Sequence, residues 1–308
     1  MIDDHISFTE TEQLTCQGAR LMERGRSYFI AAGGPPSLAV VLGKRLYAPD
    51  LVYALGDGTI DPQPDFPPRK ESTPYTRATA WADLNTVRFH ATAGYMDYAV
   101  LEAIQVDQYG NFNTSMRGTD YQRPRRRFGG AGGANELASC CWRTILVMDL
   151  EKRRFVPKVD FITSPGYLDG SPGARERAGL PADTGPWRVV TDDALFGYDE
   201  ESHRMEVLAV GQWTSLERVL QKMSFEPLVA KDLKVLEPPS LLELWCLRTE
   251  IDPERVQLAG LESDFVAPQG GWIRPGGQAG VMDEAAYVDM PASYQELLER
   301  RAREKKGT

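Results

Sequence analysis

The residues best suited to chemistry lie in a glycine-rich loop, FGGAGGAN, at positions 128–135. Glycine has no side chain, so the backbone N–H groups of such a loop can approach a ligand closely. A short helix is predicted directly after the loop, and its first N–H groups join the same array of donors. The pattern therefore predicts a site for an oxyanion or a phosphate, formed by Gly130, Ala131, Gly132, Gly133 and Asn135.

Two other features bear on this site. A basic run precedes the loop and contains Arg123, Arg125, Arg126 and Arg127. Such a run is typical of a solvated surface, but its position beside an anion-binding loop also favours contact with phosphate groups. A second turn, with Gly33 and Gly34, follows a predicted strand, where it forms a tight strand-to-helix turn or a second ligand cradle. The main loop lacks both the Gly-Lys-Ser/Thr of a P-loop and the glycine spacing of a dinucleotide fingerprint.

Composition excludes several classes of protein. The 308 residues carry a formal net charge of -9, whereas a protein that tracks nucleic-acid phosphates is normally basic. No apolar run reaches the roughly 18 residues of a membrane span, and the N-terminus does not resemble a secretory signal. The four cysteines show no metal-ligand spacing, which favours reduced thiols in a cytoplasmic protein. We expect no metal and no bound redox cofactor.

The elements that must position these loops form an open, mainly parallel α/β sheet flanked by helices. Helices are predicted over 7–25, 37–46, 135–141, 214–223 and 240–250, the first with a capping box of Ser7 and Glu10. Strands are predicted over 28–32, 51–55, 98–106 and 144–148, with a hairpin tip at 199–202. Alternation of strand, glycine turn and helix is the repeating unit of a parallel sheet. We expect one domain over 1–255 and a C-terminal arm over 256–308.

Several colinear motifs resemble the β subunit of glutaconate CoA-transferase, a class I CoA-transferase. They are KRLYAPD at 44–50, QVDQYGNFNTS at 105–115, FGGAGGAN at 128–135, EKRRFVPKVDFITSPGYLDG at 151–170, RERAGLPADTGPWRVVTD at 175–192 and EIDP at 250–253. The resemblance implies an open α/β fold and an α2β2 heteromer with an α-subunit partner. It also implies an acyl-CoA substrate, with the loop at 129–133 stabilising the thioester carbonyl oxygen. Coenzyme A is then part of the substrate, with Gly33, Gly34, Arg125 and Arg127 as its predicted contacts.

One position departs from the family pattern. The resemblance places a nucleophilic glutamate, which carries CoA during transfer, at the end of the strand after YAPD, and Gly56 stands there. Asp57 is a weak replacement, because successive residues of an extended chain point to opposite faces and aspartate is shorter. Gln105 and Asn113 are predicted to orient the substrate, or else to stabilise turns.

This departure leaves three hypotheses for function. The favoured one is a subunit of an enzyme that cleaves a carbon–carbon bond of an acyl-CoA thioester, by hydrolysis or decarboxylation. Both reactions need the thioester carbonyl polarised, because both pass through an enolate. The second is CoA transfer with a carboxylate from Asp57 or elsewhere. The third is a non-catalytic partner that binds an α subunit.

Overall fold

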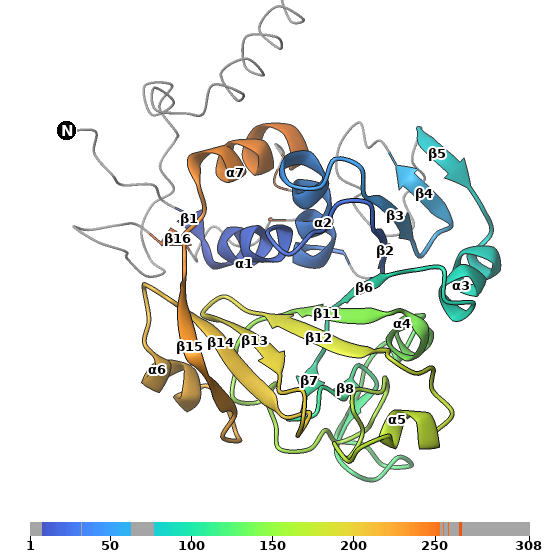
Figure 1. The fold of residues 1–308 in the computed structure, drawn as a ribbon, viewed down its shortest axis with the longest axis vertical. Helices are drawn as coiled ribbons and strands as arrows, with labels where there is room; N and C mark the ends of the chain where they lie inside the picture. The colour runs from blue at the N-terminus through green and yellow to red at the C-terminus, as the bar shows by residue number, and fades with distance from the viewer. Residues whose placement is uncertain are drawn as a thin grey trace, which may run out of the picture.

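The computed structural model describes residues 8–31, 33–62 and 77–252, together with 255, 258 and 265–266. Its centre is a ten-stranded sheet with the strand order β15-β14-β13-β12-β11-β6-β2-β3-β4-β5 (Figure 1). Five adjacent central strands run parallel to one another: β12 (Gly185–Val190), β11 (Arg143–Val147), β6 (Tyr98–Leu101), β2 (Ser27–Ile30) and β3 (Val52–Leu55). The predicted open, mainly parallel sheet is therefore confirmed.

The outer strands extend the sheet on both sides. Antiparallel hairpins add β4 (Thr59–Pro62) and β5 (Ala78–Trp81) beside β3. On the opposite side β13 (Ala194–Tyr198) and β14 (Met205–Gly211) are antiparallel, and β15 (Leu228–Leu236) pairs in parallel with β14. The β13–β14 connection at 199–202 confirms the predicted hairpin tip.

Helices cover the two faces of the central sheet. One face packs against α1 (Glu10–Ala19) and α2 (Pro35–Leu46) in a core cluster that includes Leu14, Val40, Ile30 and Leu55. The opposite face packs against α3 (Leu84–Thr92) and α4 (Ala134–Cys140), whose Val87 and Leu137 share the largest core cluster. The apolar residues of β2 and β3 are consecutive, and because successive side chains point to opposite faces they supply both clusters, as a sheet buried on both sides requires.

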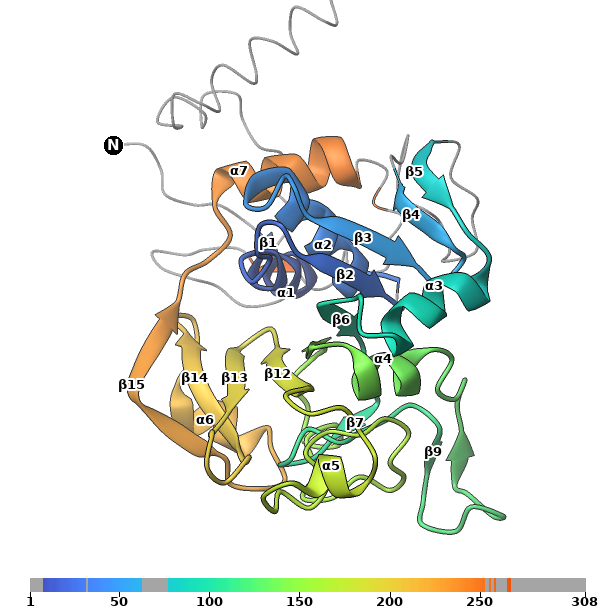
Figure 2. The ribbon, with the colours of Figure 1, turned by 45° about the vertical axis from the view of Figure 1, so that its right-hand side comes forward.

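Short elements complete the described chain. Beyond the main sheet, β7 (Gln105–Val106) pairs with β8 (Phe112–Asn113), and β9 (Met116–Arg117) pairs with β10 (Arg126–Arg127). Figure 2 shows β9 at the lower right, outside the main sheet. The remaining elements are α5 (Ala174–Arg177), α6 (Leu216–Gln221), α7 (Leu241–Trp245), a π-helix (Cys246–Ile251), and the pair β1 (Phe8–Thr9) and β16 (Phe265–Val266).

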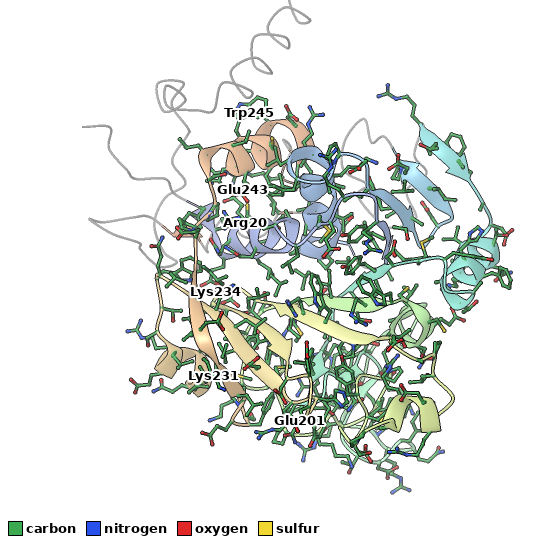
Figure 3. All side chains as sticks on the ribbon, in the orientation of Figure 1. Arg20, Glu201, Lys231, Lys234, Glu243 and Trp245 are labelled. Carbon is green, nitrogen blue, oxygen red and sulfur yellow. The ribbon has the colours of Figure 1, made fainter. Side chains whose placement is uncertain are left out.

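Helix α7 and the π-helix that follows it pack over the outer side of α1 and α2 (Figure 1). Arg20 at the end of α1 donates to both carboxylate oxygens of Glu243, with Nε to Oε1 at 2.8 Å and the terminal nitrogen to Oε2 at 2.7 Å. The hydroxyl of Tyr47 donates to the same carboxylate at 2.7 Å. Figure 3 shows Arg20 and Glu243 facing each other between the two helices. The charged groups thus fasten the ends of the described chain together.

Several predicted element boundaries were wrong. α1 begins at Glu10 with a capping box of Thr9 and Glu12, because Phe8 and Thr9 already pair as a strand with β16. Ser7 lies outside the described residues. Ser215, rather than Thr214, caps α6, and the helix expected over 240–250 changes to π geometry at Cys246. The strand expected over 98–106 divides into β6 and β7. Almost all of the predicted arm over 256–308 lies outside the described residues.

Candidate functional site

The order of strands has a switch point between β2 and β6. From β2 the chain passes through α2 to β3 on one side, and from β6 it continues through α4 to β11 on the other. In open α/β sheets, ligands bind in the crevice at the carboxyl ends of the strands beside such a point. Gly33 and Gly34 follow β2, and Gly56 follows the neighbouring parallel strand β3. The topology therefore brings these three predicted site residues to one edge of the sheet.

Gly56 occupies the first position after β3, and its environment is open. A Cβ atom built on Gly56 has no heavy atom of the described residues within 4 Å, apart from its two chain neighbours. Two residues further on, Gly58 has a φ of +95°, and a Cβ there would lie 1.9 Å from the carbonyl oxygen of Ala82. The turn therefore demands glycine at position 58 but leaves space for a side chain at position 56.

The carboxylates that follow Gly56 have local partners. Asp57 Oδ1 accepts a hydrogen bond from the N–H of Thr59 at 2.8 Å, which closes the turn into β4. Asp61 forms an ion pair with Lys44 of α2 and accepts a hydrogen bond from Thr79 Oγ1 at 3.3 Å. This geometry occupies one oxygen of Asp57 and gives no support to its predicted use in place of a glutamate.

The glycine loop is fastened to the segment after β8. Thr114 Oγ1 donates to the Gly130 carbonyl at 2.8 Å, and the Gly130 N–H donates to the Thr114 carbonyl at 3.1 Å. The Gly130 N–H is therefore used within the protein and is not a free donor of the predicted anion site. Within the described chain, the N–H groups of Ala131, Gly132 and Gly133 have no hydrogen-bond partner. Together with the Gly129 N–H, which also has no hydrogen-bond partner in the described chain, these groups are available donors of the loop.

Two side chains flank the loop. Asn135 donates from Nδ2 to the Thr163 carbonyl at 2.8 Å, so its amide holds the loop against the 161–164 segment. Arg88, which sequence reasoning missed, projects from α3 so that its Nε lies 3.3 Å from the Cβ position of Gly133. Its Nε is buried, has no hydrogen-bond partner in the described structure and lies 3.9 Å from Glu136 Oε2. Nothing in the sequence around Arg88 distinguishes it from an ordinary surface arginine of a helix, so the sequence gives no signal of this placement.

Gln105 and Asn113 form a buried pair behind the loop. Asn113 Nδ2 donates to Gln105 Oε1 at 2.7 Å and to the Met116 carbonyl at 2.6 Å, while its Oδ1 accepts from the N–H groups of Ser115 and Met116. Asn113 is fully buried and Gln105 is 2% exposed. Their amides stabilise the β7–β8 hairpin and the turn after it, which agrees with the second of the two predicted roles, the stabilisation of turns.

The structure separates the two arginines predicted to contact CoA. Arg127 lies over the ring of Tyr121, 4.4 Å from its centroid, and donates to the Tyr121 carbonyl. Arg125 instead lines a cleft of about 540 Å³ with Arg126, Phe128 and Thr114, next to the glycine loop. Of the two, only Arg125 is therefore placed to meet a ligand near the loop.

The described residues contain no group of three or more histidine, cysteine, aspartate or glutamate side chains arranged to hold a metal ion. The four cysteines are free thiols. None of the described helices is long and apolar enough to cross a membrane.

Comparison with known proteins identifies the family. The Coenzyme A transferase family matches residues 58–222, which is more than half of the chain. The chain belongs to the CoA-transferase family. The B subunit of glutaconate CoA-transferase from Acidaminococcus fermentans is 36% identical, over 81% of this chain and 95% of that protein. The crystal structure of that enzyme superposes with a TM-score of 0.76 and 34% identity, covering 82% of this chain and 98% of the other.

Other members of the CoA-transferase family are similar over most of their length. The B subunit of 3-oxoadipate CoA-transferase from Pseudomonas knackmussii is 30% identical, over 79% of this chain and 93% of that protein. The cholesterol ring-cleaving hydrolase IpdB subunit of Mycobacterium tuberculosis is 29% identical, over 72% of this chain and 85% of that protein. The family thus includes subunits of both transferases and a hydrolase, and these relatives are subunits of larger enzymes.

Proposed function

We propose that this chain is the β-type subunit of a heteromer that cleaves a carbon–carbon bond of an acyl-CoA thioester, by hydrolysis or by decarboxylation. The observation that carries the proposal is Gly56. The position where the transferase pattern has its nucleophilic glutamate carries no side chain, although a Cβ atom there would meet no other described residue within 4 Å. Without that carboxylate the covalent enzyme–CoA intermediate of transfer has no attachment point.

The glycine loop supplies what the proposed reactions have in common. When a carbon–carbon bond breaks and leaves its electron pair on a carbon conjugated with the thioester carbonyl, the pair is delocalised onto the carbonyl oxygen as an enolate. Fixed N–H donors aimed at that oxygen stabilise the developing charge. We assign this role to the N–H groups of Ala131, Gly132 and Gly133, which have no hydrogen-bond partner within the described chain. In hydrolysis, water attacks a second carbonyl and the enolate is protonated; in decarboxylation, CO2 leaves and the same enolate is protonated.

A partner subunit completes the proposed site. Asp57 closes its own turn, and the amides of Gln105 and Asn113 are buried in internal hydrogen bonds. A group that activates water or protonates the enolate is therefore proposed to come from an α-type subunit. The names of the relatives, such as the B subunit of glutaconate CoA-transferase, support a heteromeric assembly of this kind.

The test uses the chain purified together with its α-type partner. The complex is mixed with glutaconyl-CoA and with ring-derived β-keto acyl-CoA esters, each with and without acetate, and the products are followed by mass spectrometry. Loss of CO2, or a gain of the mass of one water by the acyl-CoA, in the absence of acetate is the expected result. Formation of acetyl-CoA by the unaltered protein would contradict the proposal and favour transfer.

A variant provides the matched control for this experiment. Gly56→Glu restores a carboxylate in open space and is expected to form a covalent acyl-CoA-derived adduct that hydroxylamine releases. Gly56→Ala fills part of the same space without a nucleophile and is expected to form no adduct. An adduct on the unaltered chain would show that another carboxylate already serves this step.

A further inference from the structure

A strongly basic cleft lies beside the glycine loop, although the whole chain carries a net charge of -9. The cleft has a volume of about 540 Å³, within the range of small-molecule sites. Three separate segments supply its cations, and one acidic side chain, Glu102, lies among them. The cations are Arg117, Arg125, Arg126, Arg153 and Arg154.

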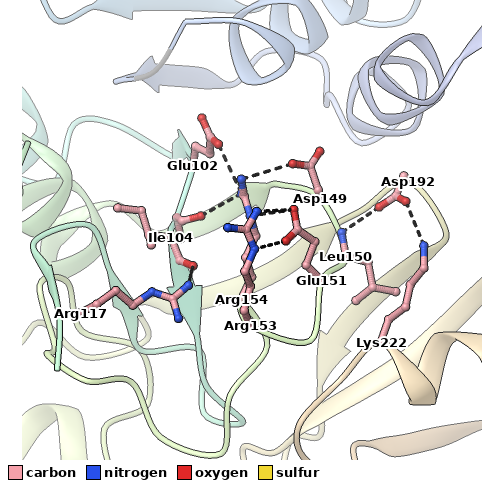
Figure 4. A network of polar contacts seen from close by, with 11 residues as sticks. Glu102, Ile104, Arg117, Asp149, Leu150, Glu151, Arg153, Arg154, Asp192 and Lys222 are labelled. Atoms are coloured by element: carbon pink, nitrogen blue, oxygen red, sulfur yellow. Dashed lines mark hydrogen bonds and ion pairs between the residues drawn. The ribbon is translucent and has the colours of Figure 1, made fainter. Parts of the chain in front are cut away.

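Backbone pairing places these arginines together. Arg126 of β10 stands opposite Arg117 of β9, and the Arg125 N–H donates to the Arg117 carbonyl at 2.8 Å. The Val106 N–H donates to the Arg154 carbonyl at 2.8 Å, which brings the 151–154 turn beside β7. Figure 4 shows Arg117 and Arg154 approaching Ile104 from two sides. The cleft is therefore formed by backbone pairing between separate segments, and not by the arginines of one stretch of sequence alone.

The charges of the cleft are only partly neutralised. Arg154 lies 3.5 Å from Glu102 and 3.3 Å from Asp149, and Arg153 pairs with Glu151 (Figure 4). In contrast, the structure shows no ion pair for Arg117, Arg125 or Arg126 across the residues that it describes. Burial lowers the pKa of Arg117, and the charges of Arg153 and Arg154 act in the same direction, whereas the carboxylates of Asp160 and Glu151 oppose the shift. Three guanidinium groups thus remain to receive an anion, and each can bind a carboxylate or phosphate with two hydrogen bonds.

The wall of the cleft is continuous with the loop. Thr114, which lines the cleft, forms two hydrogen bonds with Gly130. Phe128, which also lines it, directly precedes Gly129, and the guanidinium of Arg126 lies 5.0 Å from the centre of its ring. An anion in the cleft therefore lies beside the group of N–H donors that faces the thioester in the proposed reaction.

We infer that the arginine cleft binds a second, negatively charged group of the same acyl-CoA molecule whose thioester meets the glycine loop. This inference rests on the proposed acyl-CoA substrate. The anion is a carboxylate of the acyl chain or a phosphate of the CoA moiety, and both have the oxygen geometry that guanidinium groups recognise.

Binding measurements on the complex with the α-type partner separate the two sources. The probes are glutaryl-CoA, butyryl-CoA, which lacks the acyl carboxylate, and glutaryl-pantetheine, which lacks the phosphates. The variant Arg125→Ala/Arg126→Ala removes two cations from the cleft. Arg123→Ala/Lys158→Ala removes two exposed cations that do not line it and serves as the control. Dissociation constants from calorimetry need no turnover, so a failure of the proposed reaction does not affect this test.

The expected result is selective. If the cleft binds the acyl carboxylate, the double variant binds both glutaryl ligands about tenfold more weakly and butyryl-CoA as before. If it binds a phosphate, both CoA esters weaken by a similar factor and glutaryl-pantetheine does not. Arg125→Lys/Arg126→Lys, which keeps the charges, retains part of the affinity. The inference is overturned if the alanine variant matches the control on all three probes, or weakens all three equally.

Discussion

Thr114 and Gly130 are joined by two hydrogen bonds that fix the glycine loop to the body of the protein. The hydroxyl of Thr114 donates to the Gly130 carbonyl at 2.8 Å, and the Gly130 N–H returns a bond to the Thr114 carbonyl. Gly130 has a φ of +90°, so the loop adopts a conformation that other residues rarely take. These bonds decide where the next three N–H groups point.

Replacing the hydroxyl tests this positioning. Thr114→Val keeps the shape and the backbone bond but removes the bond from Oγ1. We expect kcat to fall about tenfold with little change in KM, because donors that stabilise a developing oxyanion act mainly in the transition state. Thr92→Val removes a comparable bond to the Phe89 carbonyl, on the far end of α3, and should leave kcat unchanged. Equal kcat values for both variants would show that the hydrogen bond from Thr114 to the loop does not contribute to catalysis.

Substitution by alanine should have very different effects on stability at the two glycines of the β3–β4 turn. Gly58→Ala should destabilise the chain by roughly 3 kcal/mol or more, because the new Cβ meets the Ala82 carbonyl oxygen and the φ of +95° is strained. Gly56→Ala should change the free energy of unfolding by no more than about 0.5 kcal/mol, since its Cβ enters open space. Urea-induced unfolding of the two variants and the unaltered chain measures the difference. A large loss at position 56 would show that the turn needs glycine there for a structural reason.

Sequence alone predicted the parallel sheet and the glycine loop, because strand, turn and helix signals repeat locally along the chain. It also identified Gly56, since that required only one aligned position. It did not predict the arginine cleft, in which Arg117 and Arg154 meet Arg125 through the β9–β10 pairing and the turn at 151–154. Contacts between these separate segments depend on tertiary structure, which the sequence does not show.

The roles that the sequence left open have a similar physical origin. A polar residue beside a glycine loop fits catalysis and internal hydrogen bonding equally well until its burial is known. Asn113 is fully buried and its amide is engaged at both ends, which sequence cannot show. The sequence does not decide between Ser7 and Thr9 as the helix cap, because both stand three residues before a glutamate. Pairing of Phe8 and Thr9 with β16 decides between them.

The contact between Arg20 and Glu243 predicts a stability effect. The Glu243 side chain is fully buried, whereas that of Arg20 is 25% exposed. Burial opposes ionisation of Glu243, but the hydrogen bonds and charge of Arg20 outweigh it and lower the pKa of the carboxyl. Arg20→Ala leaves this carboxylate without its cation, and we expect a loss of about 2–3 kcal/mol.

The control for this prediction lies four residues away. Arg24 forms an ion pair with Asp50 in which both side chains are at least half exposed, so Arg24→Ala should cost less than about 0.5 kcal/mol. Urea-induced unfolding at pH 7 compares the two variants. Because the folded-state pKa of Glu243 is lowered, its contribution is present above the ordinary pKa and declines as the pH falls below it. Equal losses for the two variants would contradict the argument from burial.

Asp192 predicts the opposite dependence on pH. Burial raises the pKa of the Asp192 carboxyl to about 6, against an ordinary value of 3.8, although the charge of Lys222 opposes the shift. Between these values the folded chain binds the proton more tightly than the unfolded chain. The group therefore favours folding most at low pH, and this contribution is lost as the pH rises through about 6.

Asp192→Asn removes this titration while its side-chain oxygen can still accept the Leu150 N–H. The stability of the variant relative to the unaltered chain should therefore rise by roughly 2 kcal/mol between pH 4.5 and pH 7. Urea-induced unfolding at both pH values measures this change, and Glu200→Gln, at an exposed position, controls for the loss of a negative charge. A constant difference across the range would mean that Asp192 has the same proton affinity in the folded and unfolded chain, and that Lys222 compensates fully for its burial.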